Sequence, residues 1–303
     1  MPPLTAITIG NFDGVHVGHI QLVRMARAAV GDEGHVIVLS FDPHPASILH
    51  PEQVPQRLST CEQRSRLLKQ VGADEITCLQ PTLEFLQQEP EEFLTTTVNP
   101  YRPDVIVEGP DFRFGHGRAG TVQTLRSLEA RHGFHTVVID PVEIALSDHS
   151  LVRVSSSVIR WLLERGRVRD AARLLGRPYE LVGPVIAGDR RGREIGIPTA
   201  NLDHDDLLLP GDGIYAGTAV LDDGRSCPAA ISVGRKPTFG GGERICEAHL
   251  LGHDGPLDDY GWTAHLQFHD WIRDQVAFSS VQRLVRQMHR DIARVGALRA
   301  TAE

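Results

Sequence analysis

A motif rich in glycine and histidine occupies residues 10–19, which read GNFDGVHVGH. It lies between an apolar, strand-like run at residues 6–9 and a helical stretch that extends to about residue 30. Glycines let a backbone turn tightly, and the start of a helix offers free N–H groups to anions. Imidazoles at His16 and His19 could donate hydrogen bonds to phosphate oxygens. The motif therefore indicates a nucleotide phosphate site, with an ordinary surface loop or a metal-binding histidine pair as the alternatives.

Three further polar segments follow apolar runs in the first half of the chain. FDPHP at 41–45 predicts a rigid loop at the end of a strand, or a plain structural turn. GPDFRFG at 109–115 alternates aromatic and polar residues and could contact a ring and a phosphate together, although a buried hairpin would look similar. SSSVIR at 155–160 is typical of a helix N-cap, and its Arg160 could also clamp a phosphate.

The most informative segment of the second half is GPVIAGDRRGREIGIPTAN at 183–201. Its glycines and arginines favour a flexible loop that binds phosphate, or a glycine-rich turn with solvated arginines. Thr199 and Asn201 would lie on one face of an extended chain and present two neutral oxygens. Mg²⁺ prefers oxygen ligands and retains several waters, so two such oxygens together with ATP phosphates would suffice to hold it.

The elements that must position these motifs differ between the two halves. In the first half, short apolar runs alternate with helical stretches, and a capping box at Thr60 and Gln63 predicts one helix start. Such alternation predicts a parallel sheet covered by helices on both faces, with ligands at the carboxyl ends of its strands. The predicted strands are residues 6–9, 36–39, 75–77, 105–107 and 136–139.

Two short helices, broken at Gly166, are predicted over residues 155–175. Beyond them, short apolar runs with frequent turn signals predict an antiparallel β-barrel or sandwich, and helical spacing over 281–295 predicts a terminal helix. The predicted strands here are residues 181–186, 214–221, 229–233, 245–251 and 263–268. The fold class is thus α/β, with a first domain at 1–173 and a barrel domain at 174–303.

Composition limits the function classes. The 303 residues, 41% hydrophobic and 23% charged, suit about two globular domains. The first residues lack the charged and apolar regions typical of a signal peptide, so we expect none. No apolar run is long enough to span a membrane, and the four dispersed cysteines form no CxxC pair. A net charge of −8 argues against a nucleic-acid coat. We therefore expect a cytoplasmic protein with small-molecule partners, no nucleic acid and no membrane, as a monomer or weak homo-oligomer.

At these motifs the chain resembles the bacterial bifunctional riboflavin kinase/FMN adenylyltransferases, also called FAD synthetases. GNFDGVHVGH, FDPHP, GPDFRFG and VSSSVIR occur in the family's order and spacing. The resemblance implies a nucleotidyltransferase-like first domain, which joins FMN to the AMP of ATP and releases pyrophosphate. The implied catalytic residues are His16, His19 and Arg160; those for ATP and phosphate are Gly10, Asn11, Phe12, Gly14, Gly18, Ser156 and Ser157; those for flavin are Asp42, His44, Asp111, Phe112 and Arg113.

The second half resembles the riboflavin kinase part of the same family, which converts riboflavin and ATP to FMN. The resemblance implies that Glu247, in an E-x-H segment, is the general base. It further implies ATP binding by Gly188, Gly192, Arg193 and Gly196, Mg²⁺ binding by Thr199 and Asn201, and flavin binding by Arg273. The chain departs from the family pattern at three positions, Ser157, Pro110 and Lys236.

Three other functions remain open at the level of the sequence. The chain could keep only one of the two activities, or bind flavin or nucleotide for regulation without turnover. A class I aminoacyl-tRNA synthetase also carries a His-x-Gly-His motif, but it would need a second, lysine-containing motif that this chain does not clearly offer.

Overall fold

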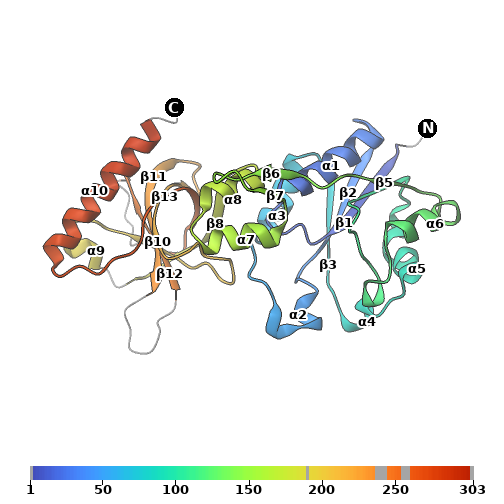
Figure 1. Cartoon of the computed structure of the whole chain (residues 1–303), viewed down its shortest axis with the longest axis horizontal. Helices are drawn as coiled ribbons and strands as arrows, with labels where there is room; N and C mark the ends of the chain where they lie inside the picture. Colours follow the sequence, from blue (N-terminus) through green and yellow to red (C-terminus); the bar gives the residue numbers. More distant parts are fainter. Residues whose placement is uncertain (1–2, 189–190, 236–243, 254–259, 301–303) are drawn as a thin grey trace. The chain divides into compact units, whose positions relative to one another are not determined.

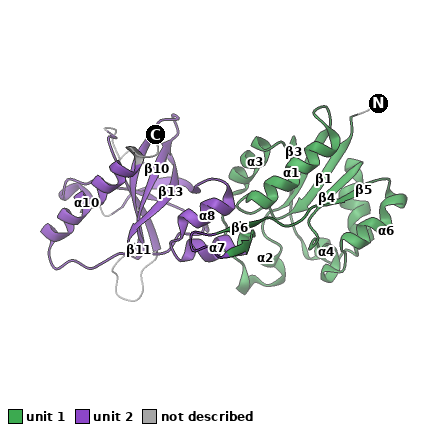
Figure 2. Ribbon diagram, turned by 45° about the horizontal axis from the view of Figure 1, so that its top comes forward, with its two compact units in different colours: residues 1–145, 151–156 green, residues 146–150, 157–303 purple. Residues whose placement is uncertain are grey.

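The structure is a computed structural model that describes residues 3–188, 191–235, 244–253 and 260–300. Packing divides the chain into two units (Figure 2). The first unit comprises residues 1–145 and 151–156, and the second comprises residues 146–150 and 157–303.

The first unit is built on a parallel sheet of five strands in the order β3-β2-β1-β4-β5 (Figure 1). All five lie where the sequence predicted strands: β1 (Thr5–Gly10), β2 (His35–Phe41), β3 (Glu75–Leu79), β4 (Val105–Glu108) and β5 (His135–Val138). The strand order changes direction beside β1, between β1 and β4. At such a switch point the loops leaving the carboxyl ends diverge and open a crevice for a ligand.

Both faces of this sheet are buried, as predicted. Ile7 and Ile37 belong to one apolar core, whereas the adjacent Ala6 and Val36 belong to another. Because successive side chains of a strand point to opposite faces, these are the two faces of the sheet. Helices α1 (Val17–Val30) and α3 (Cys61–Gln70) cover one face, and α5 (Pro90–Phe93) and α6 (Val122–His132) cover the other (Figure 1). The short helices are α2 (Ala46–Leu49), η1 (Pro51–Gln53), α4 (Leu83–Leu86), η2 (Leu94–Val98), η3 (Asn99–Tyr101) and η4 (His116–Arg118).

The start of α3 confirms the capping box. The Thr60 hydroxyl accepts from the Gln63 N–H at 3.1 Å, and the Gln63 side chain accepts from the Thr60 N–H at 2.9 Å. Two N–H groups that the helix itself leaves unpaired are thereby satisfied.

The segment between the sheet and the barrel holds one element that was not predicted, an antiparallel pair of β6 (Glu143–Ala145) and β7 (Leu151–Arg153). The two predicted helices follow as α7 (Ser156–Glu164) and α8 (Val168–Leu175), with Gly166 between them at φ +68°. α8 packs on strands of the barrel, so both helices fall almost entirely in the second unit. This packing boundary precedes the division predicted at 173/174.

The second unit contains a closed antiparallel barrel of six strands, which decides between the barrel and the sandwich (Figure 1). Its order is β10-β11-β12-β9-β8-β13. The elements are β8 (Tyr179–Ile186), α9 (Arg191–Glu194), β9 (Ala200–Leu202), β10 (Gly213–Leu221), β11 (Ser226–Arg235), β12 (Arg244–Leu250), β13 (Thr263–Arg273) and the terminal helix α10 (Val281–Ala300). The three-residue strand β9 was not predicted, although it lies between β12 and β8 in the closed barrel.

The barrel interior is filled by side chains. Tyr179, Tyr215 and Phe268 are fully buried, and their rings are in contact. On β12, the buried Cys246 and Ala248 alternate with half-buried residues that face the outside of the wall. Helix α10 packs against β10 and β11. The space available to a ligand therefore lies between the outer face of the barrel wall and this helix.

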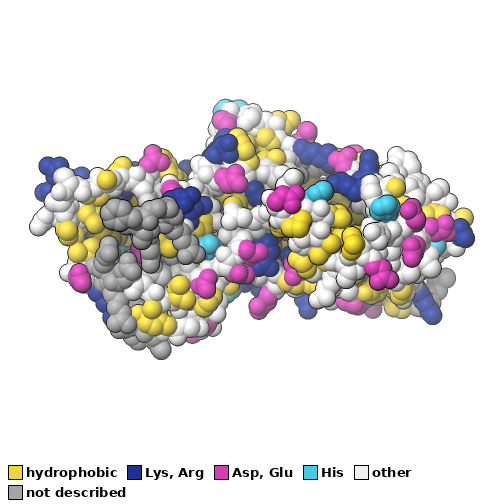
Figure 3. Space-filling model, turned by 90° about the horizontal axis from the view of Figure 1, so that it is seen from below, with side chains coloured by type: hydrophobic (Ala, Val, Ile, Leu, Met, Phe, Trp, Pro, Cys, Tyr) yellow, Lys and Arg dark blue, Asp and Glu magenta, His cyan; other side chains and the backbone are white. Residues whose placement is uncertain are grey.

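None of the helices in the described ranges combines the length and apolar character that crossing a membrane requires. Cationic and anionic side chains are interspersed over the described part of the face drawn in Figure 3. The four cysteines are free thiols.

Two candidate active sites

The loop between β1 and α1 is shaped by a buried carboxylate. Asp13 accepts hydrogen bonds from the backbone N–H groups of Leu58 and Ser59 at 3.0 and 3.1 Å. The Ser59 hydroxyl in turn accepts from the Gly14 N–H at 2.9 Å. Asp13 therefore fastens the GNFDGVHVGH loop to the segment before α3.

Two residues of this loop adopt a left-handed backbone that side chains disfavour. Phe12 has φ 49° and Val15 has φ 41°, and both are fully buried. Such conformations cost on the order of 1–3 kcal/mol each and persist only where the surrounding packing enforces them. Such conformations cluster at functional sites, and the phosphate-binding role of the loop stays a prediction.

His16 and His19 lie together at the start of α1. The rings are stacked with centroids 3.5 Å apart, and Nδ1 of His16 caps the helix by accepting from the His19 N–H at 3.3 Å. Because Nδ1 of His16 accepts, Nε2 carries the proton in the neutral ring and is a donor. Among the described residues, no group of three or more His, Cys, Asp or Glu side chains is arranged to hold a metal.

Two glycines of the motif let aromatic rings approach the backbone. A Cβ on Gly18 would lie 3.2 Å from the His16 ring, and one on Gly10 would lie 3.3 Å from the Phe12 ring. Gly14 adopts φ +78°, which a side chain would disfavour. A side chain at Gly10 or Gly18 would therefore crowd a neighbouring ring, and one at Gly14 would strain the backbone.

The carboxyl ends of β1 and β2 bring two predicted residues together. The Asn11 side-chain amide lies 3.1 Å from Nε2 of His44, whose Nδ1 accepts from the Ala46 N–H at 3.0 Å. Asp42 is joined to α3 by an ion pair of 3.3 Å with Arg64. The FDPHP segment therefore borders the same edge of the sheet as the GNFDGVHVGH loop.

Arg64 is a residue of this site that the sequence analysis missed. It is buried, and its guanidinium donates to the Asn11 carbonyl at 3.0 Å, the Ser40 hydroxyl at 2.9 Å and the Phe41 carbonyl at 2.7 Å. It therefore ties the ends of β1 and β2 to α3. The sequence offers one signal for this role: Arg64 lies in the first turn of a capped helix, three residues after Cys61. In all other respects it looks like a solvated arginine.

Glu108 is the second missed residue. It ends β4 beside the switch point, is 2% exposed, and accepts from the Ile9 N–H at 2.6 Å. Burial holds the pKa of the Glu108 carboxyl well above its ordinary value, so folding favours its protonated form.

We expect the stability of a Glu108→Gln variant, relative to the unsubstituted protein, to increase with pH. Glutamine can still accept from Ile9 but has no proton to lose. Because the folded pKa of Glu108 exceeds the unfolded value of about 4.3, the unsubstituted protein loses stability above that pH, by at most about 1.4 kcal/mol per pH unit until the folded pKa is reached. Urea unfolding of both proteins at pH 5 and pH 8 measures the difference, and a pH-independent difference would contradict the raised pKa.

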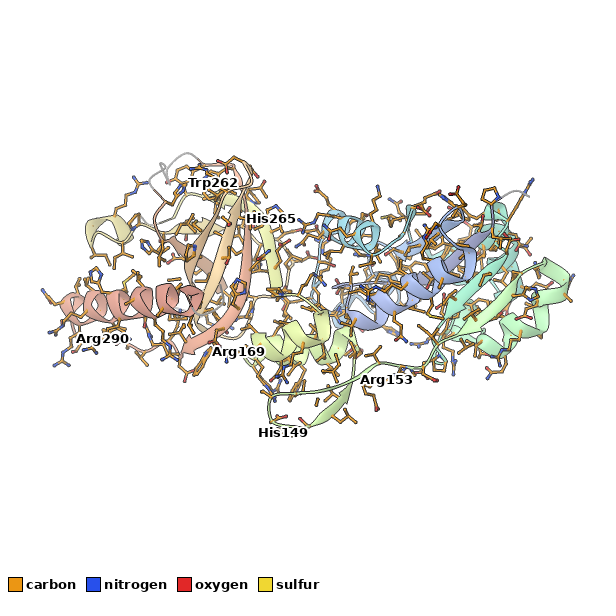
Figure 4. The ribbon with its side chains drawn as sticks, turned by 90° about the horizontal axis from the view of Figure 1, so that it is seen from above. His149, Arg153, Arg169, Trp262, His265 and Arg290 are labelled. Atoms are coloured by element: carbon orange, nitrogen blue, oxygen red, sulfur yellow. The ribbon has the colours of Figure 1, made fainter. Side chains whose placement is uncertain are left out.

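The GPDFRFG segment is partly a packing element. Phe112 stacks on Phe114, with ring centroids 5.3 Å apart and against the core of the sheet. Asp111 forms an ion pair with Arg153 of β7, and Arg153 is labelled in Figure 4. Arg113 is exposed and donates to the Phe112 carbonyl at 2.9 Å. The aromatic residues are therefore anchored in the core and the charged ones are at the surface.

The serines of α7 are divided between the units. The Ser156 hydroxyl donates to the Asp13 carbonyl at 2.9 Å, so Ser156 is bonded to the GNFDGVHVGH loop. Ser157 and Arg160 belong to the second unit by packing, and their contribution to the phosphate site stays a prediction.

The second unit contains a cavity of about 460 Å³ between the barrel wall and α10. Five predicted residues line it: Gly192, Thr199, Asn201, Glu247 and Arg273. The polar or flexible lining residues that were not among the predicted site residues are Ser232, Arg235, His249, Gln275, Met288 and Asp291. Lys236 lies outside the described residues.

Strand register places the central polar groups of the cavity in one row. Asn201 of β9 lies opposite Glu247 of β12, which lies opposite Ser232 of β11. Side chains directly opposite on neighbouring strands are about 5 Å apart at Cβ. A carboxylate, an amide and a hydroxyl therefore face the same space.

The glycines of the 183–201 segment make room for this row. A Cβ on Gly188 would lie 2.1 Å from the Asn201 amide, and one on Gly192 would lie 2.3 Å from the Ile197 carbonyl. Gly196 takes φ +76° in the turn between α9 and β9. Gly188, Gly192 and Arg193 also border a small hollow with Thr199 and Asn201. The structure thus brings together the residues predicted for phosphate and for metal.

Arg273 lines the cavity, but its guanidinium is held by a partner from α10. Its Nε and Nη2 donate to the buried Asp291 carboxylate at 3.1 and 2.7 Å, and Gln287 donates to the same carboxylate at 2.9 Å. The neighbouring Arg290 points away from the barrel (Figure 4). Asp291 shares a helix face with Met288 and Val295, so an acidic residue on an apolar stripe was the signal that could have revealed it.

Known proteins resemble this chain along nearly its whole length. Residues 2–157 match the model of the FAD synthetase family, and residues 175–298 match that of the riboflavin kinase family. The bifunctional riboflavin kinase/FMN adenylyltransferase of Escherichia coli (strain K12) is 32% identical, covering 94% of this chain and 90% of that protein. Its counterpart from Pseudomonas fluorescens is 33% identical, covering 97% of this chain and 92% of that protein.

A solved structure has the same fold. It is titled as a macrolide-efflux protein from Streptococcus pneumoniae and matches with a TM-score of 0.85 and 32% identity, covering 97% of this chain and 94% of that one. These matches show that the chain belongs to the family of bifunctional riboflavin kinase/FMN adenylyltransferases.

Proposed function

We propose that the chain performs both reactions of its family at the two sites described. The barrel transfers the γ-phosphoryl group of ATP to riboflavin and forms FMN. The first unit transfers the AMP part of ATP to FMN, which forms FAD and releases pyrophosphate. The observation that supports this assignment best is the row of Asn201, Glu247 and Ser232, which faces a cavity of about 460 Å³ beside a glycine-lined loop.

In the kinase reaction, Glu247 acts as the general base. A ribityl hydroxyl is a poor nucleophile, so Glu247 removes the proton of this hydroxyl. At the same time the hydroxyl oxygen bonds to the γ-phosphorus of ATP, and the bond from that phosphorus to ADP breaks. Glu247 can reach the hydroxyl because it faces the cavity from the middle of β12. Arg273 contributes to the flavin end of the same cavity, held in place by Asp291.

Mg²⁺ is the metal that fits the kinase site. The Thr199 hydroxyl and the Asn201 amide offer neutral oxygens where the glycines leave space, and a Cβ at Gly188 would fill part of that space. A bound Mg²⁺ would neutralise phosphate charge. Gly188, Gly192, Arg193 and Gly196 form the loop that carries the ATP phosphates.

In the adenylylation reaction, positioning and charge neutralisation do the work. The FMN phosphate is already a nucleophile, and its oxygen attacks the α-phosphorus of ATP as pyrophosphate leaves. His16, His19 and the first N–H groups of α1 donate hydrogen bonds to the phosphates, with Arg160 and the serines of α7 as further donors. Asp42, His44, Asp111, Phe112 and Arg113 border the flavin.

One assay tests both assignments. The pure protein is incubated with riboflavin, ATP and MgCl₂, and the flavins are separated by chromatography; both FMN and FAD should accumulate. FMN without FAD, even when FMN is supplied, would contradict the proposed first-unit site. The absence of both products would indicate a binding protein instead. A parallel incubation with excess EDTA should abolish both products if Mg²⁺ serves both sites.

The two activities should be separable in fragments. We expect residues 157–303 to form FMN but no FAD, because all the cavity residues lie beyond position 157. A fragment of residues 174–303 lacks most of α8, whose Val168 and Ala171 are buried. It should melt at least about 5 °C lower, since each large buried apolar side chain contributes about 1.5–3 kcal/mol. Thermal unfolding with the riboflavin assay checks this, and FAD formation by either fragment would contradict the division.

We further propose that the enzyme works in the cytoplasm as a monomer or weak homo-oligomer, because its substrates are small molecules and its cysteines are free thiols. Size-exclusion chromatography with light scattering measures the assembly state.

A further inference from the structure

The barrel cavity is lined by one imidazole of β12, that of His249. His249 lies two residues after Glu247 on the same face of β12 and lines the same cavity. Its Nδ1 is 2.8 Å from the Pro198 carbonyl oxygen. A carbonyl oxygen can only accept, so Nδ1 of His249 carries a proton and donates it in this hydrogen bond.

The hydrogen bond falls where the strand pairing ends. β9 pairs with β12 from Ala200, opposite Ala248, so Pro198 lies beyond the ladder. On the other side of Pro198, the backbone is held by a bond of 2.8 Å from the Ile197 N–H to the Gly192 carbonyl. Thr199 therefore lies between two anchored residues, Ile197 and Pro198, and the strand pairing that begins at Ala200.

We infer that His249 is a positioning residue for the phosphate end of the kinase site. Its Nδ1–H fixes the Pro198 carbonyl and thereby orients the next residue, Thr199, toward the cavity that both line. This inference rests on the proposed kinase site. It separates the roles of two residues on one strand face: Glu247 acts on the hydroxyl of riboflavin, whereas His249 acts through the backbone on the binding of ATP.

Two substitutions distinguish this role from direct action of the imidazole. The side-chain nitrogen of asparagine is bonded to Cγ, as Nδ1 of histidine is, whereas that of glutamine is one bond further out and corresponds to Nε2. His249→Asn therefore keeps a donor for Pro198 and removes the titratable ring. His249→Gln moves the donor away, and His249→Ala removes it.

The experiment measures the kcat of riboflavin phosphorylation and the KM values for ATP and riboflavin at saturating Mg²⁺, using the full chain. Loss of one hydrogen bond lowers an affinity by roughly 3- to 10-fold. We therefore expect His249→Gln and His249→Ala to raise the KM for ATP by roughly the same factor. The KM for riboflavin should not change, and His249→Asn should stay within about twofold of the unsubstituted enzyme. An unchanged KM for riboflavin, which binds in the same barrel, reports that the barrel of each variant is folded, and conversion of supplied FMN to FAD checks the first unit.

Two results would overturn the inference. If His249→Asn is as impaired as His249→Ala, the imidazole acts directly and not through Pro198. If all three variants behave as the unsubstituted enzyme does, the hydrogen bond positions nothing. Glu247→Gln is measured beside them: full kinase activity in that variant would contradict the proposed base, while the three His249 variants would still decide the role of His249.

Discussion

Glu247→Gln should lower the rate of FMN formation by roughly 10²–10⁴, the range expected for removal of a positioned base. Glutamine keeps the size of the side chain and can still form hydrogen bonds at this half-buried position, so the barrel should fold. Adenylylation needs no base because the FMN phosphate is already ionised. Supplied FMN should therefore still become FAD at the normal rate. The measurement is the initial rate of each reaction, followed by chromatography.

Glu180→Gln is the matched control for this variant. Glu180 is also a half-buried carboxylate on a barrel strand, β8. Its carboxylate lies 3.3 Å from His265, which is labelled in Figure 4, and 3.2 Å from Gln267, and it does not line the cavity. Its substitution should leave both rates unchanged. A Glu247→Gln protein that phosphorylates riboflavin at the normal rate would eliminate the proposed base.

Comparison with Thr199→Ala separates loss of the base from loss of metal binding. Thr199 faces the cavity beside Asn201 and is proposed to hold Mg²⁺. If weaker metal binding is the cause of its defect, raising the Mg²⁺ concentration should restore much of the rate. The defect of Glu247→Gln should not respond to Mg²⁺.

His19→Ala should lower FAD formation by roughly 10²–10³, the usual cost of removing one donor to the charge that develops in a transition state. His19 is a better choice than His16, because Nδ1 of His16 also caps α1 and its removal would weaken the helix. Riboflavin phosphorylation should stay near normal because it occurs in the other unit. Rates of FAD formation from supplied FMN check the effect.

His35→Ala provides the control for His19→Ala. His35 begins β2 at the amino end of the sheet and faces Glu75 at 3.4 Å, so it lies at the edge opposite the GNFDGVHVGH loop. It should leave FAD formation unchanged. An equal loss of both activities in a folded His19→Ala protein would mean that the two reactions share a site.

Much of the fold could be predicted because it depends on local patterns. The central strands β1, β2 and β4 are nearly continuous apolar runs, and such runs alternating with helices predict a parallel sheet covered on both faces. The capping box at Thr60, the break at Gly166 and the spacing of α10 are equally local. The GNFDGVHVGH and PTAN segments were predicted for the same reason, because short polar segments after strands carry their chemistry with them.

What the sequence could not determine depends on side chains that meet across long separations. Arg64 joins the ends of two strands, Glu108 bonds to the backbone of β1, and Asp291 holds Arg273 from another element. In each case, an ionisable residue is buried against a partner that is not its neighbour in the sequence, so no local pattern distinguishes it from a solvated surface residue.

Sequence alone thus determined the class of fold, the two sets of motifs and the residue types that carry the chemistry. The tertiary structure decided that the second unit closes into a barrel through the three-residue strand β9, and that α7 and α8 pack with it. It also placed Glu247 on the outer face of the wall, opposite Asn201 and Ser232. The reason is physical: periodicity and turn chemistry act over a few residues, whereas strand register and closure are set by pairings between segments that are distant in the chain.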